Sequence, residues 1–235
     1  MRGAETHSRL RRSRMLECDV GAMNLALFDF DGTITSTDTW TPFMRMAVRP
    51  SRLRMAVVVL SPVIVGNRLG MISSSKGRQA AARVGFAGEP ARAIRQHGEQ
   101  YATTVLPSTL QPRALERLEW HRSQGDRVVV VSASLDVYIA PWCAERGLEF
   151  ICTTLEERDG RLTGRYVDGD CCGPEKARRI RARYDLGRYS VVYAYGDSGE
   201  DREMMALAHK KFYRWQEIGS WDQVTSFGHP DEVEG

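Results

Sequence analysis

The stretch LALFDFDGTITSTD, residues 25–38, decides how the chain is interpreted. Four apolar residues, 25–28, run directly into Asp29, and a second carboxylate, Asp31, follows two residues later, before a Gly-Thr pair. A short apolar run of this kind is typical of a buried strand. A carboxylate at its end is costly to bury unless something compensates its charge. The stretch therefore raises the question of which groups elsewhere in the chain accompany the two aspartates.

Two further apolar runs alternate with amphipathic segments. RVVVVSAS, 127–134, follows LQPRALERLEWHRSQG, and SVVYAYGDS, 190–198, follows EKARRIRARYDLG. Short β-branched runs alternating with helical stretches predict a parallel sheet with crossover helices, and an uninterrupted run such as 128–131 fits a strand buried on both faces. We therefore predict an α/β fold with a doubly wound parallel sheet. Asp159-Gly160 between two extended stretches adds a predicted hairpin over 151–167.

Residues 41–110 do not follow this rhythm. Ala, Arg, Met and Leu recur there at helical spacing, and Thr41 before Pro42 is a candidate N-cap for the first helix. The sequence predicts a helical cap, 41–110, inserted after the first strand and its loop into a core formed by 23–40 and 111–218. We expect residues 1–22 to be a disordered basic extension, with a targeting arm as the alternative, and residues 219–235 to be a frayed tail.

Charge is distributed unevenly along the 235 residues. The formal net charge is +3, but residues 41–110 hold ten Lys/Arg against two Glu, a net +8. Residues 1–22 carry +2, which leaves −7 for the remainder. A basic insertion in an acidic body suggests an anionic partner for the insertion. A solvated basic helix face is the alternative.

The longest apolar run is MAVVVLSPVIVG, 55–66. It is shorter than the roughly 18 residues of a membrane span. Because arginines flank it, the segment 49–68 is a candidate for peripheral contact with an anionic bilayer surface at the inner face of the membrane; packing as the core of the cap is the alternative. The five cysteines show neither CxxC spacing nor a nearby histidine pair, which argues against zinc and against a disulfide framework. A reducing, cytoplasmic setting is expected.

Polar residues gather where the predicted strands end and where one helix begins. They are Asp29 and Asp31 after the first strand, Ser132 at the end of the second, Asp197 and Asp201 after the third, and Lys176 near a helix start. Because ligands of open α/β sheets bind beyond the carboxyl ends of the strands, we expect these residues to form one site.

This set of groups suits phosphoryl transfer. Mg²⁺ prefers carboxylate, water and phosphate oxygens as ligands. One carboxylate can attack phosphorus to form an aspartyl phosphate, and a second can serve as general acid and base. A hydroxyl and the N–H groups of a helix N-terminus can bind phosphate oxygens. Each part alone is a weak signal, but their combination at three strand ends favours one phosphoryl-transfer site.

In this order DFDGT, VVVVSAS, EK and YGDSGED resemble the four motifs of the haloacid dehalogenase (HAD) superfamily of phosphohydrolases, and the similarity runs from about Met23 to Trp215. The insertion resembles the helical C1 cap of the subgroup that includes phosphoserine phosphatase. The resemblance implies that Asp29 is the nucleophile, Asp31 the general acid and base, and Lys176 the charge-neutralising lysine. It further implies that phosphate is bound by Ser132, Ala133 and Gly32, that Mg²⁺ is held by Asp29, Asp197 and the Asp31 backbone carbonyl, and that Asp201 orients a metal-bound water or the lysine.

The chain departs from phosphoserine phosphatases at two places. Motif II reads Ser132-Ala133-Ser134 rather than Ser-Gly-Gly, and Asp38 stands where those enzymes carry a Glu that meets the substrate amine. Asp38 is therefore a candidate substrate contact, with a helix N-cap as the alternative, and phosphoserine is not the expected substrate. The DGRLTGR hairpin and the segment 193–215 also resemble members of the subgroup grouped with phosphatidylglycerophosphatase C, whose substrate is a phospholipid precursor.

The expected activity is Mg²⁺-dependent hydrolysis of a small or lipid-linked phosphate monoester through an aspartyl phosphate. The expected partner is a phosphorylated small molecule or an anionic phospholipid, and not a nucleic acid. Two alternatives are a phosphatidylglycerophosphate phosphatase at the membrane surface and a phosphotransferase, such as a mutase, with the same intermediate. Asp31 disfavours a receiver-like binding module, because a second carboxyl beside the phosphorylated residue shortens its lifetime, and it disfavours dehalogenase chemistry, which needs neither Asp31 nor Mg²⁺.

Overall fold

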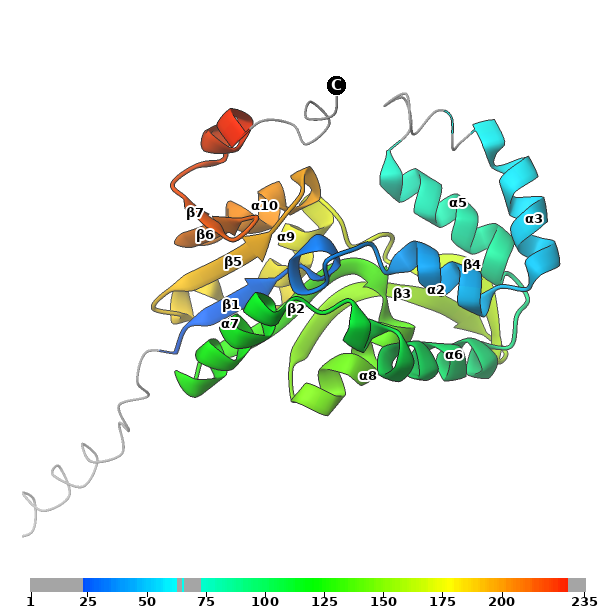
Figure 1. Cartoon of the computed structure of the whole chain (residues 1–235), viewed down its shortest axis with the longest axis horizontal. Helices are drawn as coiled ribbons and strands as arrows, with labels where there is room; N and C mark the ends of the chain where they lie inside the picture. The colour runs from blue at the N-terminus through cyan, green and yellow to red at the C-terminus, as the bar shows by residue number, and fades with distance from the viewer. Residues whose placement is uncertain (1–22, 63–64, 66–72, 228–235) are drawn as a thin grey trace, which may run out of the picture.

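The structure is a computed structural model that describes residues 23–62, 65 and 73–227. The predicted extension, 1–22, and the last part of the predicted tail, 228–235, lie outside the described residues. Figure 1 shows a central sheet with helices on both sides and a group of helices gathered over one end of it.

The sheet has seven strands among the described residues, in the order β4-β3-β2-β1-β5-β6-β7. The five central strands, which lie next to one another, run parallel: β3 (Glu149–Arg158), β2 (Arg127–Leu135), β1 (Leu25–Phe28), β5 (Val192–Gly196) and β6 (Lys210–Tyr213). The edge strands β4 (Arg161–Val167) and β7 (Gln216–Ile218) are antiparallel to their neighbours. The predicted α/β fold with a largely parallel sheet is confirmed, and the predicted hairpin is the β3–β4 pair.

Alternate residues of β1 contribute to two separate hydrophobic clusters. Ala26 and Phe28 belong to a cluster that includes residues of α7 (Pro112–Ser123) and α8 (Asp136–Arg146). Leu25 and Leu27 belong to a second cluster with residues of α9 (Pro174–Arg183) and α10 (Arg202–Met205). Since helices cover both faces, the central strands carry uninterrupted apolar runs rather than alternating ones.

Four helices of the insertion are described: α2 (Trp40–Ala47), α3 (Pro50–Val59), α5 (Ser74–Phe86) and α6 (Ala91–Thr104). Phe43, Phe86 and Tyr101 of the insertion share one hydrophobic cluster with Tyr138 of α8, and the Phe43 and Tyr138 ring centroids are 4.8 Å apart. In Figure 1 α6 runs alongside α8, and α5 lies over β4. This packing fixes the insertion against the core.

The predicted N-cap of the first insertion helix was wrong. α2 begins at Trp40, so Thr41 is already inside the helix and Pro42 is its third residue. The N–H groups of Trp40 and Thr41 donate instead to the Asp38 carboxylate, both at 3.1 Å. The short aspartate side chain therefore satisfies the first-turn amides that have no partner within the helix.

Two predicted boundaries also differ from the structure. β2 does not end at Ser132 but continues to Leu135, with a shift in its register against β3 between these two residues. Such irregularities bend a strand and redirect its side chains near active sites. The tail that was expected to fray from residue 219 contains a 3₁₀ helix, η5 (Trp221–Phe227), and Trp221 packs edge-on against Tyr213 with ring centroids 5.4 Å apart.

The described part of the apolar stretch 55–66, namely 55–62 and 65, is not the core of the cap. No side chain of α3 is buried. Met55, Val57, Val58 and Val59 are 51%, 62%, 74% and 58% exposed, respectively, because α3 lies at the periphery of the molecule (Figure 1). The cap-core alternative is therefore wrong for the described part of the stretch. No helix within the described ranges has the length and apolar character needed to cross a membrane.

Candidate active site

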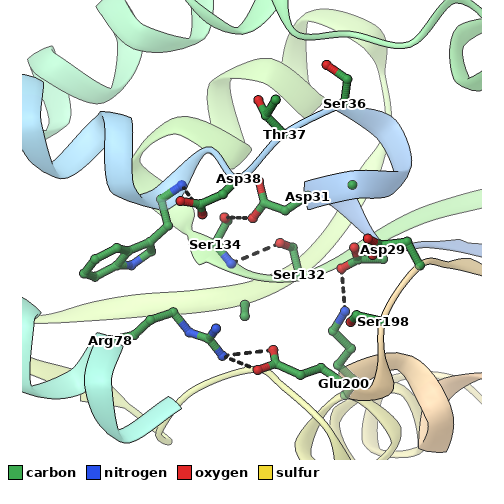
Figure 2. A pocket seen from close by; sticks show the side chains of 15 residues that line it. Asp29, Asp31, Ser36, Thr37, Asp38, Arg78, Ser132, Ser134, Ser198 and Glu200 are labelled. Carbon is green, nitrogen blue, oxygen red and sulfur yellow. Dashed lines mark hydrogen bonds and ion pairs between the residues drawn. The ribbon is translucent and has the colours of Figure 1, made fainter. Parts of the chain in front are cut away.

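A cavity of about 340 Å³ lies at the carboxyl ends of β1, β2 and β5. Of the residues singled out from the sequence, it is lined by Asp29, Asp31, Gly32, Asp38, Ser132, Ala133, Lys176 and Asp197. Asp201 lies outside the cavity wall and is fully buried. Figure 2 shows the side chains converging on this space from both the core and the insertion.

Parallel register brings the distant segments to one level. Phe28, the last residue of β1, pairs with Val130 of β2 on one side and with Tyr195 of β5 on the other. The residues that follow each strand therefore emerge together, and Asp29 and Asp197 face the same space. The prediction that these residues form one site rested on the rule that ligands of open α/β sheets bind beyond the carboxyl ends of the strands.

Lys176, in the first turn of α9, connects the carboxylates. Its ammonium donates to Asp29 Oδ1 and, at 2.6 Å, to Asp201 Oδ1, and all three side chains are buried. Burial lowers the pKa of a lysine, but here the Asp201 and Asp29 carboxylates outweigh it and raise the Lys176 pKa above its ordinary value. The lysine is therefore charged and held rigidly beside Asp29.

Both carboxylate oxygens of Asp201 are engaged. Oδ1 accepts from Lys176, while Oδ2 accepts from the N–H groups of Asp197 and Ser198 and from the Ser198 hydroxyl, each at 3.2 Å. Asp201 therefore orients the lysine and the loop that carries Asp197. This geometry suits the supporting role that the family resemblance implies.

The donor set fits a divalent metal ion. One carboxylate oxygen each of Asp29, Asp197 and Asp201 lies within 4.8 Å of the others. Burial raises the pKa of Asp29 well above its ordinary value, and the Asp201 charge raises it further. Burial and the Asp201 charge raise the pKa of Asp197 to about 6. Three carboxylates beside one ammonium repel one another, and a hard cation such as Mg²⁺ would offset that repulsion.

Gly32 is required by the close approach of the loop to this cluster. Its φ is +75°, and a Cβ at this position would lie 2.1 Å from Asp197 Oδ2. Only glycine allows both the positive φ and this contact.

Since Asp201 already accepts four hydrogen bonds, Asp29 and Asp197 are the carboxylates best placed to bind the ion directly.

Asp31 is held by hydrogen bonds from two hydroxyls and one amide. Its Oδ1 accepts from the Thr39 hydroxyl and, at 2.9 Å, from the Thr39 N–H. Its Oδ2 accepts from the Ser134 hydroxyl (Figure 2). Burial raises the pKa of Asp31, and the hydrogen bonds from Ser134 and Thr39 oppose this rise. The result is a carboxyl group held in one orientation, with a pKa above its ordinary value.

Several residues of the site were not predicted from the sequence. Thr39 positions Asp31, and Tyr101 of α6 donates to the Thr39 carbonyl at 3.0 Å. Arg78 of α5 lines the cavity and donates to Asp170 at 2.9 Å and to Glu200 at 3.0 Å, which joins the insertion to the core. Nothing in the spacing distinguished Arg78 from the other basic residues of the insertion. Ser134 was noted only as a neighbour of Ser132.

Asp38 lines the cavity from the insertion side. It also caps α2, so the capping alternative describes what its carboxylate does in this structure. A contact between Asp38 and substrate stays a prediction.

Comparison with known proteins identifies the family. Residues 26–206 match the haloacid dehalogenase-like hydrolase family. The chain belongs to this family, which confirms the resemblance and makes it a hydrolase. Protein CicA of Caulobacter vibrioides is 31% identical over 192 residues, which cover 81% of this chain and 85% of the relative.

Solved structures share the fold. A protein with unknown function from Bordetella pertussis Tohama I has a TM-score of 0.70 at 20% identity, with 88% of this chain and 94% of that chain covered. A phospho-aspartyl intermediate analogue of phosphoserine phosphatase has a TM-score of 0.57 at 17% identity, with 88% and 99% covered. At these identities, the two similarities show that the fold is shared and no more than that.

Proposed function

We propose that this chain is a Mg²⁺-dependent phosphomonoester hydrolase that works through an aspartyl phosphate on Asp29. The observation that carries the proposal is the placement of the Asp29 carboxylate at a cavity wall, held by Lys176 and next to Asp197, with Asp31 across the same cavity. Family membership supports the same chemistry. A phosphoserine phosphatase that shares the fold was solved as a phospho-aspartyl intermediate analogue.

The first step transfers the phosphoryl group to Asp29. The Asp29 carboxylate oxygen attacks phosphorus, the bond between phosphorus and the ester oxygen breaks, and the departing alkoxide takes a proton from Asp31. In this proposal Lys176 and the Ser132 hydroxyl bind the phosphoryl oxygens, and the fact that both line the cavity together with Asp29 supports this role. Bound Mg²⁺, held by Asp29 and Asp197, would neutralise charge on the phosphoryl oxygens.

The second step releases phosphate. Asp31, now ionised, takes a proton from a water molecule that attacks phosphorus, and the bond between phosphorus and Asp29 breaks. Thr39 and Ser134 keep the Asp31 carboxyl in one orientation for both proton transfers. A phosphotransferase would pass the same phosphoryl group to an alcohol. A product assay with competing alcohol acceptors separates the two: the hydrolase yields inorganic phosphate, with no phosphorylated acceptor.

Metal removal tests the proposal. Exhaustive treatment with EDTA is expected to abolish hydrolysis of p-nitrophenyl phosphate, and Mg²⁺ is expected to restore it. Ca²⁺ should restore little, because its larger and looser coordination shell misplaces the nucleophile relative to phosphorus. Steady-state rates at each stage provide the measurement, and full activity after chelation would contradict the metal assignment.

Replacing Asp31 with asparagine is expected to slow hydrolysis by an amount that depends on the leaving group of the substrate. An amide cannot donate or accept the proton, so hydrolysis of an alkyl phosphate should slow by about 10²-fold or more. Formation of the phosphoenzyme from an activated aryl phosphate should slow much less, because an aryloxide leaves without protonation. Stopped-flow release of nitrophenol measures the second case. An alkyl phosphatase rate equal to that of the wild type would remove Asp31 from the acid role.

A further inference from the structure

The helix α3 is apolar on two opposite faces. Leu53, Ala56, Val57 and Leu60 recur at the i, i+3, i+4, i+7 spacing of one helix face and line a groove toward α2 and α5. Met55, Val58 and Val59 fall about half a turn away, on the outer face, and are more than half exposed. From Met55 to Leu60 the segment is therefore apolar nearly all round, which is normally the mark of a buried helix, and contiguous exposed apolar residues mark interaction sites.

The groove adjoins the active-site cavity. It has a volume of about 860 Å³ between α2, α3 and α5, within the range of about 300–1,000 Å³ that is usual for ligand sites. Asp38, Trp40 and Arg78 line both the groove and the active-site cavity. A molecule whose phosphate lies at Asp29 therefore has an apolar groove next to it that can take the rest of its length.

Basic residues stand beside the groove without neutralising partners. Arg45 and Arg54 line it and are exposed, and neither forms an ion pair with any described residue. Arg49 and Arg52, by contrast, both pair with Glu89. An exposed apolar helix with unneutralised arginines beside it is complementary to an anionic bilayer, whose surface attracts the cations while its interior accepts the apolar side chains.

We propose that the groove between α2, α3 and α5 takes the apolar tail of a lipid phosphate monoester, which the enzyme draws from an anionic bilayer in contact with the outer face of α3. This inference rests on the proposed function, because it names the substrate class of the same phosphate site. Trp40 and Arg78 stand where head and tail meet, so the phosphate reaches Asp29 while the tail stays among apolar side chains.

Gly77 offers a variant that fills the groove. It lies on α5 and lines the groove, and among the described residues no atom beyond its chain neighbours and its own helix backbone lies within 4 Å of the position a Cβ would occupy. Gly77→Leu therefore adds an apolar side chain where a tail would lie, and helix propensity favours the change. Gln79→Leu is the matched control, because it adds the same side chain to an exposed position of the same helix outside the groove.

The first experiment compares kcat/KM for three substrates: glycerol 3-phosphate, its long-chain monoacyl ester and p-nitrophenyl phosphate. Wild type is expected to favour the acylated ester over glycerol 3-phosphate at least tenfold. Gly77→Leu should reduce this preference at least tenfold more than Gln79→Leu does, with melting temperatures no lower than wild type. Equal rates on the two glycerol esters, or a preference that Gly77→Leu does not change, would overturn the inference. If wild type hydrolyses none of the three substrates, p-nitrophenyl phosphate included, the proposed phosphatase function is overturned, and this inference with it.

The second experiment measures flotation with vesicles. Wild type is expected to float with phosphatidylcholine vesicles that contain phosphatidylglycerol, to stay unbound with pure phosphatidylcholine, and to be released by high salt. The double change Val58→Asp and Val59→Asp should abolish flotation without lowering the melting temperature, because neither side chain is buried. Absence of flotation by wild type would contradict the membrane contact. So would a wild-type dimer in gel filtration that this double change converts to a monomer, because the outer face would then be covered by a second copy.

Discussion

Replacing Asp29 with asparagine is expected to abolish hydrolysis of phosphate esters. An amide oxygen cannot form the aspartyl phosphate, so kcat should fall by a factor on the order of 10⁴ or more, as it does when other enzymes lose a covalent nucleophile. Rates with p-nitrophenyl phosphate at saturating Mg²⁺ provide the measurement. Asp159→Asn is the control, because Asp159 is an exposed turn residue of the β3–β4 hairpin whose positive φ asparagine tolerates.

The same substitution should not weaken the metal-free fold. Burial and repulsion from Asp201 raise the pKa of Asp29 despite its contact with Lys176, so its ionised form is costly in the metal-free protein. Asparagine removes that charge and keeps a group that accepts a hydrogen bond from the lysine. The melting temperature of metal-free Asp29→Asn should therefore equal or exceed that of wild type. A large fall in stability together with activity would show that Asp29 is needed for folding, and the loss of rate would then say nothing of its chemistry.

Replacing Lys176 with methionine is expected to cause the largest loss of stability. The side chain is 2% exposed and lies between Asp29 and Asp201, so its removal leaves two buried carboxylates without their cation. Breaking a buried ion pair in this way costs about 3–5 kcal/mol of unfolding free energy. Urea unfolding of the metal-free protein at neutral pH measures the loss, and activity should disappear with it. Arg178→Met is the control, because Arg178 pairs with Glu175 on the exposed side of the same helix and should have little effect.

The loss of unfolding free energy in Lys176→Met is expected to depend on pH in a definite direction. The raised pKa of Lys176 means that its contribution is complete at neutral pH and is lost only as pH rises above the ordinary lysine range. In Lys176→Met the Asp29 pKa, already raised, loses the contact that lowers it. A carboxyl with a raised folded-state pKa destabilises the fold increasingly as pH rises from the ordinary carboxyl pKa up to the raised value. The difference between wild type and variant should therefore shrink on mild acidification. A deficit independent of pH would mean that Lys176 acts through packing rather than charge.

The sheet and the core half of the site were predictable because their signals are local. Each central strand is a short apolar run that ends in a distinctive residue, and parallel topology alone brings Asp29 and Asp197 to the same edge. Lys176 and Asp201 follow in the order in which the family's motifs occur along the chain, and this completed the pattern of the site. These inferences needed no knowledge of how any helix packs.

The insertion half of the site depends on packing between helices, which the sequence pattern did not contain. Arg78 reaches Asp170 and Glu200 only because α5 lies over β4, and 92 and 122 residues separate it from these partners. Thr39, which directly precedes α2, donates to Asp31, and a separation of 8 residues gives no sign of this contact in the sequence. The exposure of Val58 follows from the peripheral position of α3, whereas a run of valines in sequence is equally typical of a buried helix.

Trapping the phosphoenzyme tests most directly whether Asp29 is the nucleophile. Acid quenching during turnover, followed by borohydride reduction, converts an aspartyl phosphate into homoserine, which mass spectrometry of the peptides then locates. Homoserine is expected at position 29 when both a phosphate ester and Mg²⁺ are present, and is not expected when either is omitted or in Asp29→Asn. Homoserine at another aspartate, or its absence from position 29 under the conditions that trap a control aspartyl-phosphate enzyme during active turnover, would contradict the assignment of Asp29 as the nucleophile.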